Sequence, residues 1–300
     1  MDSPRERFLA YRGALPRPPR LAARTVRARG LDFAVFTTPP VPDATPLVCV
    51  NGGLLFDHAL LWPALAPLAA ARQLVLYDQR GRGRSQPPPG PRAARIEHDA
   101  GDLGALREAL AVARWDVLGH SWGGGIALLG AAADPAGTRR LVTVNAVGPT
   151  SRWVRDLHPR ALARLDAEQG AALAAYPHEA LLVDDPAVHA GYTRALYPAW
   201  FASRELAALF TPPRTASRTG AAVLARLRRD GYDWTAPLAD LSVPTLVIHG
   251  EDDLLPPAEA EALVALLPRA RLALVPGAGH MPFWEAPHTF FPLVERFLLE

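Results

Sequence analysis

A serine flanked by glycines, Ser121, is the residue of this chain best suited to nucleophilic chemistry. Residues 119–123 read Gly-His-Ser-Trp-Gly, the pattern G-x-S-x-G, between a predicted strand and a predicted helix. The glycines permit a tight turn, because side chains there would collide with the sheet or the helix. Such a turn exposes the hydroxyl, which can then attack a carbonyl carbon. We predict Ser121 as a nucleophile; the alternative is a glycine-rich turn that contains an incidental serine.

A serine hydroxyl needs a base, and His280 is the candidate. It ends the small-residue segment 277–280, directly after a predicted apolar strand at 272–275. In chains with this serine motif, the acid that orients the base lies between the serine and the histidine. Three acids, residues 251–253, follow a predicted strand at 245–249. One of them is expected to hold the histidine tautomer and to stabilise the imidazolium.

The other histidines are interpreted as structural. His120 adjoins Ser121, so its side chain is expected to point away from the nucleophile, and His249 is expected in the core. No motif surrounds the remaining candidates, which are predicted to be surface or packing residues: His98, His158, His178, His189 and His288.

Backbone N–H groups are predicted to bind the oxyanion that forms when a nucleophile attacks a carbonyl. One is expected from Trp122, the residue after the serine. The second is expected from Gly53, in the loop after a predicted strand at 47–50, because glycine allows a close approach of backbone and substrate. A plain turn is the alternative for this loop. The glycine-containing segment 78–85 lacks the lysine and the spacing of a P-loop, so we predict a structural loop near the site.

Short apolar strands alternate with helical segments around these residues, which predicts an α/β fold with a buried, mostly parallel central sheet. Residues 25–36 alternate in polarity around Gly30 and predict an antiparallel strand pair. The other predicted strands are 47–50, 74–77, 116–119, 140–147, 245–249 and 272–275. The predicted helices are 60–71, 97–113, 122–133, 257–267 and 284–299.

The alternation stops near Gly148 and returns at Thr245. We predict one α/β core, residues 1–148 and 237–300, interrupted by a helical cap at 149–236. The cap is rich in aromatics, which are expected to line an apolar pocket above the serine or, alternatively, to pack the insertion onto the core. They are Trp153, Tyr176, Tyr192, Tyr197, Trp200, Phe201, Phe210, Tyr232 and Trp234.

Composition excludes several classes of function. The 300 residues carry a net charge of +2, and the arginines alternate with acids and apolar residues, so no basic face for nucleic acid is expected. The first residues lack the long apolar stretch of a secretory signal, and no run of about 20 apolar residues predicts a membrane span. The single Cys49, in an apolar run, is expected in the core and fits a reducing, cytoplasmic compartment.

Together these segments resemble the α/β-hydrolase superfamily over essentially the whole chain. Four of them are most similar to its proline iminopeptidase branch: VNGG at 50–53, DQRGRGRS at 78–85, GHSWGG at 119–124 and GAGH at 277–280. The resemblance implies a helical cap, release of an N-terminal residue, usually proline, from short peptides, and no metal or organic cofactor. Similar folds place the acid three residues after the glycine that ends the strand, which selects Asp253; Asp252 remains the alternative.

The resemblance also implies that residues of the cap around Trp200 bind the substrate. The family's cap carries a tryptophan–glutamate pair that helps to bind the substrate's amino group, and here Phe201 follows the tryptophan. A charged amino terminus is costly to desolvate without a partner, so an aminopeptidase needs a carboxylate near the acyl pocket. Glu205, about one helical turn after the aromatic pair, is the first candidate, with Trp200 as a second substrate-binding residue. The other cap glutamates are Glu168 and Glu179.

The predicted function is therefore acyl transfer to water through an acyl-enzyme on Ser121. The substrate is expected to be a short peptide with an N-terminal proline-like residue or, alternatively, a small ester cleaved by a carboxylesterase. A non-catalytic ligand receptor on the same fold is the alternative of another class. No nucleic-acid or membrane partner is expected.

Overall fold

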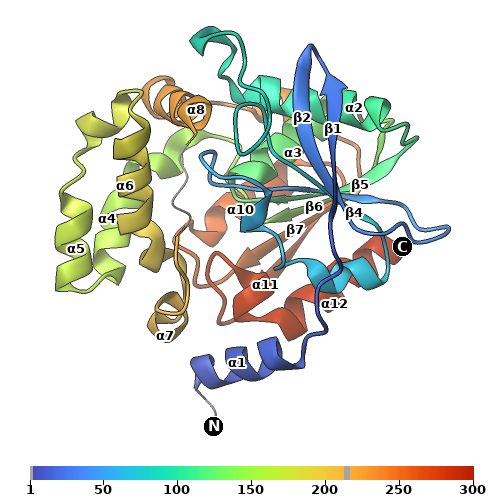
Figure 1. Ribbon diagram of the computed structural model, residues 1–300. Helices are drawn as coiled ribbons and strands as arrows, with labels where there is room; N and C mark the ends of the chain where they lie inside the picture. The colour runs from blue at the N-terminus through green and yellow to red at the C-terminus, as the bar shows by residue number, and fades with distance from the viewer. Residues whose placement is uncertain (1–2, 213–216) are drawn as a thin grey trace.

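A central sheet of eight strands organises the protein (Figure 1). The structure, a computed structural model, describes residues 3–212 and 217–300, so residues 1–2 of the predicted core and 213–216 of the predicted cap lie outside the described residues. The strand order is β1-β2-β4-β3-β5-β6-β7-β8. Their bounds are β1 Ala22–Ala28, β2 Leu31–Thr37, β3 Leu47–Val50, β4 Leu74–Tyr77, β5 Trp115–His120, β6 Thr138–Val144, β7 Thr245–Gly250 and β8 Ala270–Val275.

The sheet is mostly parallel, as predicted. The strands from β4 through β3 and β5 to β8 pair in parallel, whereas β1 pairs antiparallel with β2 and β2 with β4. Every residue of β3, β4, β5 and β7 is buried, while five of the seven residues of β1 are exposed. This difference matches the sequence, since parallel strands covered on both faces are continuously apolar.

Two hydrophobic clusters lie on opposite faces of the sheet. Successive strand residues point to opposite faces, so Val48 joins one cluster and Cys49 the other. The first cluster includes residues of α2 (Ile96–Ala109), α3 (Trp122–Ala133) and α10 (Pro257–Leu266). The second includes α11 (Pro282–Glu285) and α12 (Pro287–Leu299). Cys49 is a buried free cysteine, which confirms its predicted place in the core.

Two predicted helices have a different form. Residues 60–71 contain only short 3-10 helices, η1 (His58–Leu60) and η2 (Ala66–Ala70), because Pro63 and Pro67 lack the N–H that a continuous α-helix requires. The predicted helix 284–299 is divided between α11 and α12, since Pro287 begins a new helix. The N-terminal helix α1 (Pro4–Ala14) starts with a capping box formed by Ser3 and Glu6.

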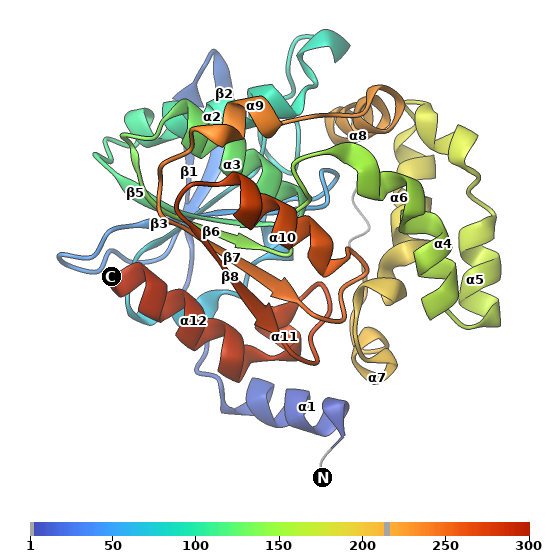
Figure 2. The same ribbon diagram turned by 180° about the vertical axis from the view of Figure 1, so that it is seen from behind.

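The described residues between β6 and β7 are helical apart from turns and one isolated bridge, Thr150 to Asp233. Figures 1 and 2 show α4, α5, α6 and α8 side by side, apart from the helices that cover the sheet. Among the described residues, no helix has the length and apolar character needed to cross a membrane. The helices of this insertion are α4 Val154–Arg164, α5 Ala167–Ala174, α6 Pro186–Leu196, α7 Arg204–Ala207, α8 Arg218–Asp230 and α9 Thr235–Ala239, with 3-10 helices η4 Ser151–Trp153, η5 His178–Leu182 and η6 Tyr197–Trp200.

Candidate active site

Ser121 occupies a strained turn between β5 and α3. Its φ of 55° lies in the left-handed region, which is uncommon for residues other than glycine. Its neighbours must be small: a Cβ on Gly123 would lie 2.2 Å from the carbonyl oxygen of Val50, and one on Gly119 would lie 2.4 Å from the carbonyl oxygen of Gly123. The turn is therefore possible only with glycine at both positions. It places Ser121 at the N-terminus of α3, where the helix dipole favours negative charge.

His280 and Asp253 meet at the carboxyl ends of β7 and β8. The Nδ1 of His280 lies 2.9 Å from Oδ2 and 3.1 Å from Oδ1 of Asp253, and both side chains are buried. A carboxylate accepts only, so Nδ1 carries the proton and Nε2 is left for another partner. Asp252 is exposed, so of the two aspartates considered from the sequence only Asp253 contacts the histidine.

Asn145 supports this aspartate. Its Nδ2 donates to Oδ2 of Asp253 over 2.7 Å and to the carbonyl oxygen of Gly279 over 3.1 Å. Burial alone would raise the pKa of Asp253, but the His280 charge and the hydrogen bonds from His280 and Asn145 hold that pKa below its usual value. Asp253 therefore stays ionised at neutral pH. Sequence reasoning missed Asn145, because it follows the end of β6 with no motif around it.

His120 contacts the loop of His280. Its Nε2 donates to the carbonyl oxygen of His280 over 2.9 Å, and the two ring centroids are 4.8 Å apart. Burial, and then the charge of His280, lower the pKa of His120 to about 3. The predicted structural role agrees with these contacts. The His120 ring also contacts Phe283, with ring centroids 5.3 Å apart.

The loop after β3 is held by the segment at 78–85. Gly53 has a φ of 76° and lines the Ser121 cavity together with Trp122. Gln79 donates from Nε2 to the carbonyl oxygen of Asn51 over 2.7 Å, and Arg82 donates from Nε to that of Leu54 over 2.8 Å. The predicted structural loop thus fixes the backbone on both sides of Gly53.

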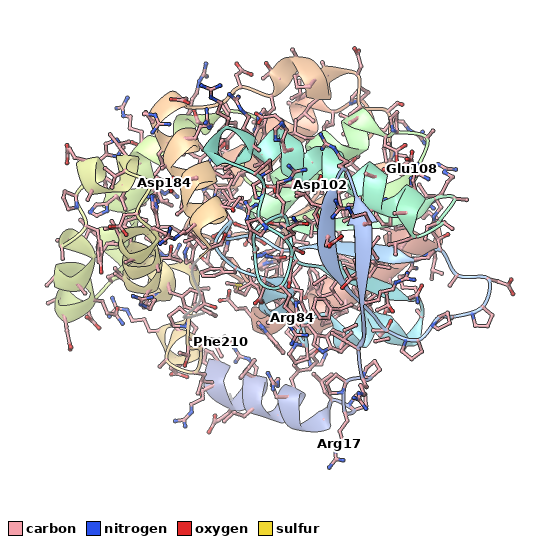
Figure 3. The ribbon with its side chains drawn as sticks, turned by 45° about the horizontal axis from the view of Figure 1, so that its top comes forward. Arg17, Arg84, Asp102, Glu108, Asp184 and Phe210 are labelled. Atoms are coloured by element: carbon pink, nitrogen blue, oxygen red, sulfur yellow. The ribbon has the colours of Figure 1, made fainter. Side chains whose placement is uncertain are left out.

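Buried ion pairs anchor this segment in turn. Arg82 pairs with Asp99 of α2 over 2.9 Å, and Arg80 with Asp102 (Figure 3 labels Asp102). Burial raises the pKa of Asp99 to about 6, against the opposing influence of Arg82. The sequence alone did not identify these ion pairs, since the local sequence of a helix does not indicate which arginine an acidic residue will contact.

The Ser121 cavity, the hollow lined by Ser121, Gly53, Trp122, Trp200 and His280, is mainly apolar. Leu157, Leu196, Leu224 and Leu227 of the insertion also line it. Three of the nine aromatics named from the sequence do so: Trp153, Tyr197 and Trp200. The Trp200 ring lies 4.1 Å from that of His280, and the Trp200 carbonyl oxygen accepts from the His280 N–H over 2.8 Å.

The remaining named aromatics pack elsewhere. Phe210 contacts Phe8 of α1 and Phe201, with ring centroids 5.4 Å and 4.9 Å away (Figure 3). Tyr232 stacks on Trp234 at 3.9 Å. The prediction that the aromatics line a pocket holds for part of the set, and packing explains the others.

Glu205 lies outside the Ser121 cavity. It is exposed on α7, and its Oε2 accepts a hydrogen bond from the backbone N–H of Arg5 over 3.3 Å. The reasoning from helical spacing was wrong here, because Phe201 is extended (φ −92°, ψ 143°) and separates η6 from α7. Glu168 and Glu179 are also exposed. None of the described residues that line the cavity is an aspartate or a glutamate.

Glu285 of α11 joins the insertion to the loop of His280. Its carboxylate accepts from the N–H groups of Ala202 at 2.8 Å, Gly279 at 3.0 Å and Met281 at 3.2 Å. Burial raises the pKa of Glu285 to about 7. Sequence reasoning did not single out this residue, which follows the histidine by five positions in an apolar helix.

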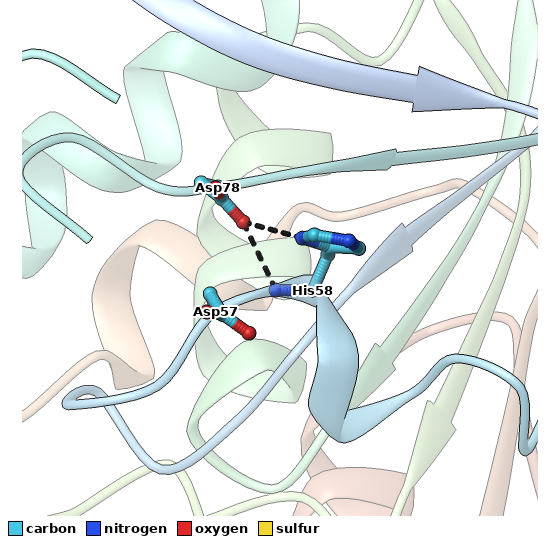
Figure 4. A group of neighbouring side chains, drawn as sticks. All are labelled: Asp57, His58 and Asp78. Atoms are coloured by element: carbon cyan, nitrogen blue, oxygen red, sulfur yellow. Dashed lines mark hydrogen bonds and ion pairs between the residues drawn. The ribbon is translucent and has the colours of Figure 1, made fainter. Parts of the chain in front are cut away.

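One group has the composition of a metal site: Asp57, His58 and Asp78, whose ligand atoms lie within 4.8 Å of one another (Figure 4). Asp78 accepts hydrogen bonds from His58 N at 3.1 Å, His58 Nδ1 at 2.8 Å and Arg84 N at 2.8 Å. The His58 ring stacks on Phe36 at 3.7 Å. These contacts fix η1 against the end of β4, and we interpret the group as structural support.

Comparisons with known proteins agree with this geometry. The model of the family described as alpha/beta hydrolase fold matches residues 45–287. A proline iminopeptidase of Levilactobacillus brevis is 30% identical over 270 residues, which cover 82% of this chain and 85% of that protein. A 2-hydroxymuconate semialdehyde hydrolase of Pseudomonas putida is 31% identical over 234 residues, 76% of this chain and 78% of that protein. The crystal structure of proline iminopeptidase from Mycobacterium smegmatis superimposes with a TM-score of 0.71 at 25% identity, covering 93% of this chain and 98% of that one.

Proposed function

The chain belongs to the α/β-hydrolase fold family, in a proline iminopeptidase-like branch, and we propose that it is a serine hydrolase working through an acyl-enzyme. The observation that carries the proposal is the bond between His280 Nδ1 and Asp253, at 2.9 Å, because His280 lines the same cavity as Ser121. That bond leaves Nε2 of His280 free to accept a proton, which a serine base must do.

In the proposed reaction, Ser121 Oγ attacks the carbonyl carbon of the substrate while His280 takes its proton. The N–H groups of Gly53 and Trp122 donate to the oxyanion, and the positive end of α3 adds to their effect. His280 then protonates the leaving group, and water attacks the acyl-enzyme by the same route in reverse. Asp253 stabilises the imidazolium throughout.

Small carboxylic esters are the substrates that the cavity fits best. An aminopeptidase must desolvate an ammonium group, which is costly unless a carboxylate receives it. The described lining of the Ser121 cavity contains no such carboxylate, and Glu205 is turned to the surface. An ester acyl group needs only an apolar wall, which Leu157, Leu196 and Leu224 provide.

Release of an N-terminal proline is the second candidate. It is favoured by the relatives, two of which carry the name proline iminopeptidase, and by Trp200, which lies against His280 as a substrate-facing aromatic. We further propose that the insertion at 149–236 acts as a cap over Ser121, that the protein acts on small molecules or short peptides, and that it works in the cytoplasm.

A substrate panel tests the proposal. Purified protein is labelled with a fluorophosphonate probe and assayed with chromogenic esters and aminoacyl anilides, including proline anilide. We expect labelling of Ser121 and turnover of esters, both abolished in Ser121→Ala. Turnover of proline anilide above that of the esters would establish the second candidate. Absence of labelling and of turnover on every substrate would leave the ligand receptor as the better interpretation.

A further inference from the structure

A single arginine reaches the Ser121 cavity from the insertion. Arg228 of α8 lines it, together with Leu224 and Leu227 of the same helix. Leu224 lies four positions before Arg228 and three before Leu227, so each of the two is a neighbour of Leu224 on the surface of α8. Apart from histidines, Arg228 is the only ionisable group with a charge at neutral pH in the described lining.

No anionic group of the described residues pairs with the guanidinium of Arg228. Among the described residues it makes no hydrogen bond and no ion pair, and its Nη1 is buried without a hydrogen-bond partner. Its one contact of note is with Tyr192, whose ring centroid lies 4.6 Å from Cζ. The three buried arginines of the core differ: Arg72, Arg80 and Arg82 each pair with an aspartate.

Burial makes the positive charge of Arg228 unfavourable in free energy. Burial lowers its pKa, which the neighbouring Tyr192 only partly offsets. His158 and His189 lie in the same region, and burial, followed by the charge of Arg228, lowers their pKa values and keeps them neutral. A cation held at this position without an anion costs free energy of folding, so a ligand that supplies the anion would bind strongly.

We propose that Arg228 binds a carboxylate carried by the substrate, so that the enzyme hydrolyses esters of acidic molecules such as half-esters of dicarboxylic acids. This inference rests on the proposed serine-hydrolase function and names its substrate class. A carboxylate carries one negative charge and matches the single positive charge of Arg228 in the described lining, whereas a phosphate dianion would leave a surplus charge in an apolar wall. The same cation repels the ammonium group of an aminoacyl substrate.

A second hollow also reaches Arg228; His158, Tyr192 and Gly231 line it, and it shares Leu157 and Leu227 with the Ser121 cavity. An anion bound there would not be joined to the ester at Ser121. The test therefore compares substrates of the same length with and without a carboxylate. Only a carboxylate that belongs to the substrate changes that substrate's turnover, so a preference for the acidic substrate indicates binding in the Ser121 cavity and not in the second hollow.

Matched methyl esters provide the test, with acid release followed by pH-stat titration. Monomethyl succinate, glutarate and adipate are each compared with the methyl ester of the monocarboxylic acid of the same length. In at least one pair we expect the wild type to favour the acidic ester by about tenfold or more in kcat/KM, as a charge-assisted hydrogen bond allows. Arg228→Gln should lose that preference through KM and keep kcat/KM on the neutral ester within about threefold. Arg228→Lys should retain part of it.

Arg229→Gln is the control, since Arg229 is exposed on the same helix and pairs with Asp230. It should keep the wild-type preference. No preference in the wild type for any acidic ester, or equal losses on both esters in Arg228→Gln, would overturn the inference. Failure of the proposed function looks different: Ser121 is then not labelled by fluorophosphonate and no ester is turned over. In that case the binding of adipate is measured by titration of the Trp153 and Trp200 fluorescence. If Arg228→Gln binds adipate as tightly as the wild type, the inference is rejected.

Discussion

The imidazole of His120 donates a hydrogen bond of 2.9 Å to the carbonyl oxygen of His280. The residue before the proposed nucleophile thus supports the backbone of the residue proposed as its base. Since a carbonyl only accepts, Nε2 of His120 must carry the proton, and its Nδ1 is buried without a partner. The site therefore requires His120 in the neutral form.

Stability should depend on pH through His120. Its pKa is about 3 in the fold against 6.5 for the free side chain, so between these values the unfolded chain binds a proton that the folded chain does not. The free energy of unfolding should therefore fall as the pH drops through this window, by about 2 kcal/mol from this group between pH 7 and pH 5. Urea unfolding at both pH values measures it. His120→Gln should show a smaller change, and an unchanged difference would contradict the assignment.

Ser121→Ala should abolish turnover and leave the fold intact. Removing the nucleophile typically costs about a thousandfold or more in rate, and the loss of one hydroxyl at the mouth of a cavity leaves the packing unchanged. Steady-state kinetics and circular dichroism check the two parts. A purified variant with more than about a tenth of the wild-type activity would show that the assignment is wrong.

Asp253→Asn should damage catalysis far more than Asp252→Asn. Asp253 is buried against Nδ1 of His280, and an amide there favours the wrong tautomer, at a cost of about a thousandfold or more. Asp252 is exposed, and its loss should change the rate by less than about threefold. Turnover of the two variants on one ester compares them directly. The reverse order would move the acid to Asp252.

Glu205→Gln should leave the rates on esters and on prolyl anilide unchanged to within about twofold. The residue lies on the surface beside α1, where its carboxylate meets the N–H of Arg5. Parallel kcat/KM measurements on both substrates provide the check. A selective loss on prolyl anilide would restore Glu205 as a site for the amino group.

The glycine-flanked turn of Ser121 and the sheet were predictable because each depends on local sequence. Gly119 and Gly123 are required where a Cβ would meet backbone within 2.4 Å, and this steric demand is visible in five consecutive residues. The buried strands were equally clear, since β3 and β4 are apolar throughout and short.

The substrate side of the site was not predictable in the same way. Helical spacing placed Glu205 beside Trp200, yet two extended residues, Phe201 and Ser203, interrupt the helical geometry between them. Arg228 was not singled out, because the sequence of α8 does not say which of its arginines faces the cavity. Both depend on how the insertion packs against the core, which no local pattern encodes.

Glu285 gives the insertion a mechanical link to the proposed base. Its carboxylate accepts hydrogen bonds from the N–H of Ala202 in the insertion and from the N–H groups of Gly279 and Met281 in the loop of His280. The carbonyl oxygen of Trp200 accepts another from the N–H of His280. These hydrogen bonds couple the two segments, so a displacement of residues 200–202 would break bonds to the loop that carries the imidazole of His280.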